Sequence, residues 1–107
     1  MKKALILLAF FVAITVLAQQ PPSPILVKDA TAATGVVIVS ADLDGKPIEL
    51  QCTQNMSACV SLKPGKYVMV QLPKNHGMYD CQNVNIYPDG ANPATAEKIG
   101  QYCLNPK

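Results

Sequence analysis

The side chain with the most obvious chemical potential in this sequence is its single histidine, His76. Asp80 follows four residues later, and an imidazole near a carboxylate can serve as a general base close to neutral pH. Covalent catalysis would also need a nucleophile, but the chain has no Gly-x-Ser-x-Gly motif and, as argued below, no cysteine that we expect to be free. The sequence therefore predicts an exposed loop histidine in a protein that is not an enzyme.

The same segment contains a soft ligand that a copper(I) ion would accept. Met78 lies two residues after His76, and Met56 and Met69 lie earlier in the chain. Thioether and imidazole are ligands that this ion prefers. The Asp42–Gly45 segment resembles the start of a calcium loop, but the twelve-residue pattern that closes on a bidentate glutamate is missing. These methionines and aspartates need no metal to explain them, so we predict no metal site and no cofactor.

The four cysteines indicate a covalent framework. An even number of cysteines in a small exported domain is typical of disulfides, here two of them with three possible pairings. A zinc site built from four thiolates is the alternative, but the gaps of six, 21 and 21 residues lack the paired C-x2-C spacing of such sites. We therefore expect disulfides among Cys52, Cys59, Cys81 and Cys103.

The amino terminus predicts export, which would expose these cysteines to oxidising conditions. Lys2 and Lys3 precede an apolar run from Ala4 to Ala18 in which only Thr15 is polar. A positive start, an apolar run shorter than a membrane span and small residues before a cut are typical of a signal peptide. We expect cleavage near Ala18 and a secreted or periplasmic bacterial protein without a transmembrane anchor. A retained amino-terminal anchor is the alternative.

The charge of the expected mature chain argues against nucleic acid as a partner. Nine lysines less Lys2 and Lys3 leave seven in residues 19–107, against seven acidic side chains and no arginine. The net charge is therefore zero, and the basic surface that nucleic acids require is not expected. A chain of this size forms one domain whose hydrophobic core gives only a thin margin of stability, so disulfides are expected to contribute.

The sequence divides into a signal peptide (1–18), a proline-rich tether (19–34) and one folded domain (35–107). Three prolines in Gln19–Pro24 favour an extended tether outside the core. Gly35–Ala41 is rich in β-branched residues and predicts a strand buried on both faces. An Asp-Gly turn in Asp42–Gly45 then leads into Ile48–Cys52, whose alternating pattern predicts the second strand of a hairpin.

The remaining segments predict further strands and one helix. Asn92 can cap a helix, Pro93 suits its first position, and Ala94–Leu104 contains good helix formers. The fold class is therefore predicted to be mainly β (small α+β): an antiparallel sheet or sandwich of about five to six short strands, with one C-terminal helix, stapled by disulfides. The other predicted elements are a strand at Ala58–Leu62, a turn at Lys63–Lys66, a strand at Tyr67–Leu72, and an edge or final strand at Asn83–Tyr87.

The faces of these elements favour one disulfide pairing. A Cys81–Cys103 bond would clamp the predicted helix onto the sheet, which leaves Cys52–Cys59 to close the loop between them. If Cys52 lay opposite Cys59 in a regular hairpin, however, apolar and polar faces would be mixed. Either a bulge intervenes or the pairing is crossed.

One segment has a familial pattern. Leu62–Val70 reads L-K-P-G-K-Y-V-M-V, and a G-V-V-I-V strand and a D-G-K turn precede it. Residues 35–72 thereby resemble extracytoplasmic β-sandwich modules of the PEGA and carboxypeptidase-regulatory-like kind, although the cysteines and residues 79–104 have no counterpart there. The whole chain is similar to small cysteine-containing proteins that bacteria secrete. The resemblance implies a non-enzymatic accessory or surface-interaction role.

The functional prediction is a binding or accessory domain that acts outside the cytoplasm on a protein or cell-envelope partner. Loops held by a rigid scaffold are common recognition sites. The alternatives are a secreted inhibitor of a hydrolase, such as a protease or lysozyme, and a structural component of the cell envelope. The predicted contact loop contains Lys74, Asn75, His76, Met78, Tyr79 and Asp80.

Overall fold

The computed structural model describes residues 21–56, 58–74 and 76–106. The predicted signal peptide and its cleavage point at Ala18 lie outside the described residues. Within the described ranges, no helix is long and apolar enough to cross a membrane.

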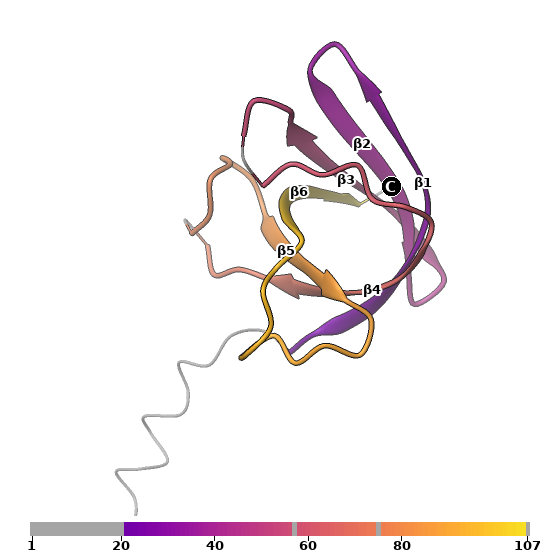
Figure 1. Ribbon diagram of the computed structural model, residues 1–107, viewed down its shortest axis with the longest axis vertical. Helices are drawn as coiled ribbons and strands as arrows, with labels where there is room; N and C mark the ends of the chain where they lie inside the picture. Colours follow the sequence, from indigo (N-terminus) through magenta and orange to yellow (C-terminus); the bar gives the residue numbers. More distant parts are fainter. Residues whose placement is uncertain (1–20, 57, 75, 107) are drawn as a thin grey trace, which may run out of the picture.

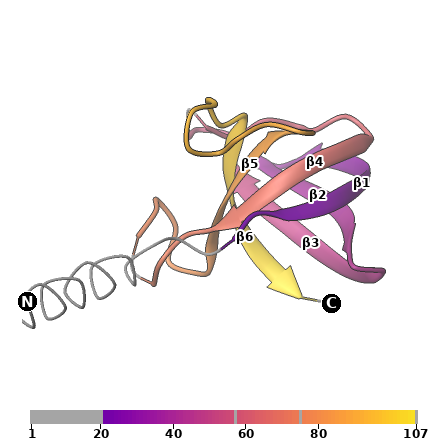
Figure 2. The same cartoon turned by 90° about the horizontal axis from the view of Figure 1, so that it is seen from below.

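The described chain is all β, without a helix, and its six strands close into an antiparallel barrel (Figure 1). The order around the barrel is β1-β2-β3-β6-β5-β4, and β4 returns to lie beside β1, as Figure 2 shows. A fourth strand that returns beside the first makes β4-β1-β2-β3 a Greek key. The strands are β1 (Ser23–Ala33), β2 (Val36–Leu43), β3 (Lys46–Thr53), β4 (Gly65–Gln71), β5 (Asn83–Pro88) and β6 (Gly100–Pro106).

The strand pairing corrects the predicted open sheet or sandwich. A closed barrel replaces the predicted open sheet or sandwich, because β1 pairs with β2 on one side and with β4 on the other. β5 likewise lies between β4 and β6, so Asn83–Tyr87 is neither an edge strand nor the final one. Closure satisfies strand edges that an open sheet would leave unpaired.

Two-residue turns join the first three strands. Asp44 and Gly45 have φ angles of 53° and 79°, and Thr34 and Gly35 have φ angles of 52° and 82°. Positive φ at both central positions is the type I′ geometry that matches the twist of a hairpin, and it explains why an Asp-Gly pair predicts this turn. Thr34 is unusual there, because β-branched residues rarely adopt positive φ.

One face of each strand fills the barrel. In β2, Val37, Val39 and Ala41 are buried while the residues between them are half-buried, so the predicted burial on both faces is wrong. Successive side chains of a strand point to opposite faces, and the outer face of a barrel wall is covered only where a loop lies on it. Buried and half-buried residues therefore alternate along the strand. The core consists of Ile25, Val27, Val37, Val39, Ala41, Ile48, Leu50, Cys52, Leu62, Met69, Val84, Ile86 and Tyr102.

The predicted tether is part of the barrel from its fifth residue onward. Ser23–Ala33 forms β1, in which Ile25 and Val27 are 3% and 1% exposed. Pro24 is the second residue of the strand, and a proline, which has no N–H to donate, is tolerated near a strand's start. The buried apolar residues that follow it attach the segment to the core. Residues 19 and 20 lie outside the described residues.

The predicted C-terminal helix is not formed. The capping signal makes only one turn: the Asn92 side chain accepts a hydrogen bond from the Ala94 N–H at 3.0 Å, and its carbonyl accepts from Ala96 at 2.8 Å. From Gly100 the chain is β6, which pairs with both β3 and β5. The two ladders that close the barrel outweigh the local helix propensity.

The described residues between β3 and β4, 54–56 and 58–64, form the crossing segment, which lies across one end of the barrel (Figure 1). The strand predicted at Ala58–Leu62 is absent, because this segment is held by isolated contacts instead of a ladder. The Ala58 carbonyl accepts a hydrogen bond from the Gln101 N–H at 3.0 Å, and the Tyr102 hydroxyl donates to the Val60 carbonyl at 2.6 Å.

Both disulfides of the favoured pairing are present. Cys52 is bonded to Cys59 and Cys81 to Cys103, with Cα–Cα distances of 5.4 and 5.8 Å. A regular hairpin with Cys52 opposite Cys59 would have mixed apolar and polar faces. This problem does not arise, because Cys59 lies in the crossing segment and not in a paired strand. Cys103 lies in β6, so its bond anchors a loop to the barrel wall and not a helix to a sheet.

Candidate functional site

Residues 72–82 connect β4 to β5, and we call them the β4–β5 loop. They contain the predicted contact residues, Lys74 to Asp80, and two flanking residues on each side. It stands out to one side of the barrel (Figures 1 and 2). Its ends are joined by the Leu72 N–H, which donates to the Asn83 carbonyl at 2.9 Å, and by the Gln82 side chain, which donates to the Leu72 carbonyl at 3.0 Å. The loop therefore leaves and re-enters the barrel at one fixed point.

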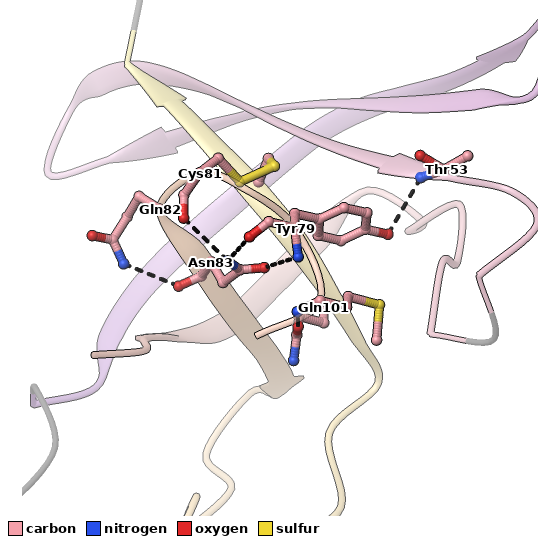
Figure 3. Close-up of a disulfide and its surroundings, with 8 residues drawn as sticks. Thr53, Tyr79, Cys81, Gln82, Asn83 and Gln101 are labelled. Atoms are coloured by element: carbon pink, nitrogen blue, oxygen red, sulfur yellow. Dashed lines mark hydrogen bonds between the residues drawn. A yellow bond between two sulfur atoms is a disulfide. The ribbon is translucent and has the colours of Figure 1, made fainter. Parts of the chain in front are cut away.

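One buried side chain, that of Asn83, holds the middle of the loop (Figure 3). Its Oδ1 accepts a hydrogen bond from the Tyr79 N–H at 3.0 Å, and its Nδ2 donates to the carbonyls of Tyr79 at 2.7 Å and Cys81 at 3.1 Å. Asn83 is only 2% exposed, so water does not compete for these bonds. The backbone from Tyr79 to Cys81 is thus fixed to the first residue of β5.

A second buried amide fixes the loop one residue earlier. The Met78 N–H donates to Gln101 Oε1 at 2.7 Å, and Gln101 Nε2 donates to Asn85 Oδ1 at 3.0 Å. Gln101 is 5% exposed and lies on the outer face of β6, opposite to the core residue Tyr102. The loop is consequently bound to two strands, β5 and β6, in addition to the Cys81–Cys103 bond.

Gly77 is required by this close packing. Its φ angle is 109°, and a β-carbon at this position would lie 2.6 Å from Asn83 Cβ. The glycine therefore allows the loop backbone to approach the side chain that holds it.

Tyr79 joins the loop to the end of β3, next to the Cys52–Cys59 disulfide. Its hydroxyl accepts a hydrogen bond from the Thr53 N–H at 3.3 Å, at the end of β3 (Figure 3). The ring lines two depressions. The larger is about 320 Å³ and is bounded by Lys74, Tyr79, Asp80, Cys81 and Gln82; the smaller is about 120 Å³ and is bounded by Val36, Gln51, Cys52, Thr53, Tyr79 and Cys103.

The predicted site residues therefore share one loop but divide into two groups. Lys74, His76, Met78 and Asp80 are exposed, whereas Tyr79 is half-buried and makes structural contacts. Asn75 lies outside the described residues. Sequence reasoning missed Asn83, because asparagines that alternate with apolar residues in a strand predict a solvent-facing side. It missed Gln101 because that residue fell in the predicted helix and not in a strand. The sequence of the loop itself gave no sign of which strands would hold it.

Within the described ranges no group of three or more histidine, cysteine, aspartate or glutamate side chains is placed to hold a metal ion. All four cysteines are disulfide-bonded, so no thiol is available as a nucleophile. Burial raises the pKa of Tyr102 to about 12, but this phenol is in the core and is bonded to a backbone carbonyl.

Comparison with known protein families, with curated proteins and with solved structures finds no significant match to this chain. The resemblance of residues 35–72 to PEGA and carboxypeptidase-regulatory-like modules stays a prediction.

Proposed function

We propose that this protein is a non-enzymatic binding module that acts outside the cytoplasm, and that the β4–β5 loop is its recognition element. The supporting observation is that buried amides hold the loop backbone while four side chains point to solvent. Asn83 and Gln101 bind the backbone of Met78–Cys81, and Lys74, His76, Met78 and Asp80 are exposed.

A loop ordered before it meets its partner has an energetic advantage. Flexible segments lose conformational entropy when they bind, whereas a preorganised loop has already lost it on folding. The depression beside Lys74 and Tyr79, at about 320 Å³, is at the lower end of the size of small-ligand sites and suits one side chain of a partner. The two disulfides are compatible with an oxidising compartment, which supports the extracytoplasmic assignment.

The hydrolase inhibitor is a special case of the same proposal. An inhibitor that mimics an extended substrate pairs its backbone with the enzyme by strand addition. The Met78 N–H is already bonded to Gln101, so this donor is not available for such pairing. We therefore favour recognition through side chains over substrate mimicry.

The test compares two triple variants of the oxidised protein. His76→Ala, Met78→Ala and Asp80→Ala together remove three exposed side chains of the loop without touching the amides that hold it. Thr95→Ala, Glu97→Ala and Lys98→Ala together are the matched control in another exposed loop, between β5 and β6. Labelled protein is titrated against extracellular and cell-envelope fractions of the organism that encodes it, and in parallel against purified serine protease, metalloprotease and lysozyme.

We expect saturable binding that the loop variant weakens at least tenfold and that the control variant retains. Loss of a hydrolase's activity that depends on the loop would identify the partner class as an enzyme. Equal binding by both variants, or no saturable binding by the native protein, would show that the β4–β5 loop is not a recognition element.

A further inference from the structure

The β1–β2 hairpin extends past the rest of the barrel and leaves part of β1 with an open edge (Figure 1). β1 pairs with β2 from Leu26 to Ala33, but with β4 only from Ser23 to Val27. Asp29–Ala33 therefore has a strand partner on one side only, as far as the described residues extend. The described part of the crossing segment makes no backbone hydrogen bond to these five residues. We call Asp29–Ala33 the open edge.

The direction of the backbone groups on this edge follows from the turn. In a hairpin with a two-residue turn, the flanking pair Ala33 and Val36 exchanges hydrogen bonds, and hydrogen-bonded and non-hydrogen-bonded pairs then alternate. Ala32 and Ala30 are opposite Val37 and Val39 in pairs of the second kind. Their N–H and C=O groups consequently point away from β2, toward the open side.

The open edge lacks the features that usually prevent strands from pairing between molecules. Exposed edges are commonly protected by lysine, proline or a bulge. Here the register shift that marks a bulge occurs before Asp29, and the edge itself contains one charge followed by alanine and threonine. Thr31, Ala32 and Ala33 are exposed. Their small side chains would not obstruct a neighbouring strand.

We propose that two copies of this chain pair through the open edge, antiparallel, about a two-fold axis at Thr31. In this register Ala30 of each copy lies opposite Ala32 of the other. Each of these two pairs exchanges two hydrogen bonds through the outward N–H and C=O groups, which makes four in all. Asp29 lies opposite Ala33, so the one charge of the edge does not meet its own copy. Such an isologous pairing closes after two copies.

The charge balance is compatible with a second copy as the occupant. Residues 19–107 carry equal numbers of basic and acidic side chains, so two copies do not repel each other overall. The edge is about 17 Å long, since strands rise about 3.4 Å per residue. An interface of this size is typical of weak association. We therefore expect a reversible dimer whose population rises with protein concentration.

The first test places a thiol on the proposed axis. Thr31→Cys brings two thiols into a non-hydrogen-bonded pair, where opposing Cα atoms are about 4.5 Å apart. Asp29→Cys is the control, because its two copies would be about 14 Å apart in the same register. Under mild oxidation we expect a covalent dimer from Thr31→Cys and a monomer from Asp29→Cys, read by non-reducing mass spectrometry with the native disulfides mapped. Equal yields from the two variants would overturn the register, and no dimer from Thr31→Cys would overturn the pairing.

The second test needs no added thiol. Sedimentation of the native protein between about 10 µM and 1 mM should show a mass that rises toward that of a dimer. Thr31→Lys, which would place two ammonium groups at the axis, should remain monomeric, while Thr31→Val should dimerise at least as well as the native chain. A native protein that stays monomeric throughout would refute self-pairing and leave the open edge to an extended segment of another protein. Dimerisation that Thr31→Lys does not weaken would show that the contact is elsewhere.

Discussion

Gly100 lies directly under the ring of Tyr102: a β-carbon at residue 100 would be 2.8 Å from the Tyr102 hydroxyl oxygen and 2.9 Å from its Cε1. The two residues are neighbours on one face of β6, and the missing side chain of the first leaves space for the ring of the second. The same β-carbon would be 2.7 Å from the Ala58 carbonyl. The crossing segment can therefore lie against β6 only because residue 100 is glycine.

Replacing this glycine should destabilise the protein. Gly100→Ala forces either the tyrosine ring or the crossing-segment backbone to move, and overpacking of this kind costs about 2 kcal/mol. Gly90→Ala is a suitable comparison, because no atom lies within 4 Å of the added β-carbon and only the positive φ of 76° is unfavourable. The free energy of unfolding in urea measures both. If Gly100→Ala lowers the free energy of unfolding no more than Gly90→Ala does, Tyr102 and the Ala58 carbonyl do not lie as close to residue 100 as described.

The hydroxyl of Tyr102 should make stability fall at high pH. Burial raises its pKa to about 12 from an unfolded value of 10, so between pH 10 and 12 the unfolded chain loses the phenolic proton and the folded chain keeps it. The contribution is complete below pH 10 and is lost as pH rises through 12, by on the order of 2 kcal/mol. Tyr102→Phe should remove this slope while costing about 1 kcal/mol at neutral pH, because the Val60 carbonyl loses its donor. Identical pH profiles of the two proteins would refute the assignment.

Asn83→Ala should release the β4–β5 loop. Three hydrogen bonds to the loop backbone are lost, so we expect a loss of about 2 kcal/mol in stability. Hydrogen exchange at the Tyr79 amide should become at least tenfold faster. Gln82→Ala is the control, since that side chain donates only to the carbonyls of Leu72 and Asn83 and leaves the Tyr79 amide bonded. Unchanged exchange at Tyr79 in Asn83→Ala would mean that the loop is held by other contacts.

The two disulfides should contribute unequally to stability. Cys81 and Cys103 are 22 residues apart and Cys52 and Cys59 are seven, and the entropy that a cross-link removes from the unfolded chain rises with this separation. Replacing both cysteines of the longer link by serine should cost about 3 kcal/mol, and of the shorter link about 2 kcal/mol. Urea denaturation of the two double variants gives both values. The reverse order would show that strain or buried contacts, and not chain entropy, decide the effect.

Thr34→Asn should stabilise the β1–β2 hairpin. Thr34 has a φ angle of 52°, which a β-branched residue adopts at a cost, whereas asparagine is favoured at this position of a type I′ turn. We expect a gain of about 1 kcal/mol in the free energy of unfolding. Thr53→Asn, at an exposed strand position, is the comparison and should bring no gain. A loss of stability in Thr34→Asn would indicate that the bond from the Thr34 hydroxyl to the Ala33 carbonyl matters more than backbone strain.

Strands that are specified locally could be predicted from the sequence. The Asp44–Gly45 turn needs positive φ at both positions, and few residue pairs other than Asp-Gly supply it, so the β2–β3 hairpin is visible in the sequence. The pairing of the cysteines was also favoured by the predicted faces of the elements, although the element that contains Cys103 was assigned wrongly.

Elements that depend on distant partners could not be predicted. Asn92 does begin a turn, and only the ladders to β3 and β5 determine that Gly100–Pro106 is extended. The three prolines before Ile25 concealed a strand whose partner β4 lies some 40 residues along the chain. The amides that hold the loop were missed for the same reason, because Asn83 and Gln101 are buried by a segment that folds back on them.

The position of β6 also determines when the protein can fold. β6 joins β3 to β5, so the ring of strands stays incomplete on the ribosome until Gly100–Pro106 has been synthesised and released from the exit tunnel. Pairings between residues far apart in sequence form slowly, which lengthens the interval before closure. The described strands therefore remain an open set until the last of them is available, so closure of the ring comes late in folding.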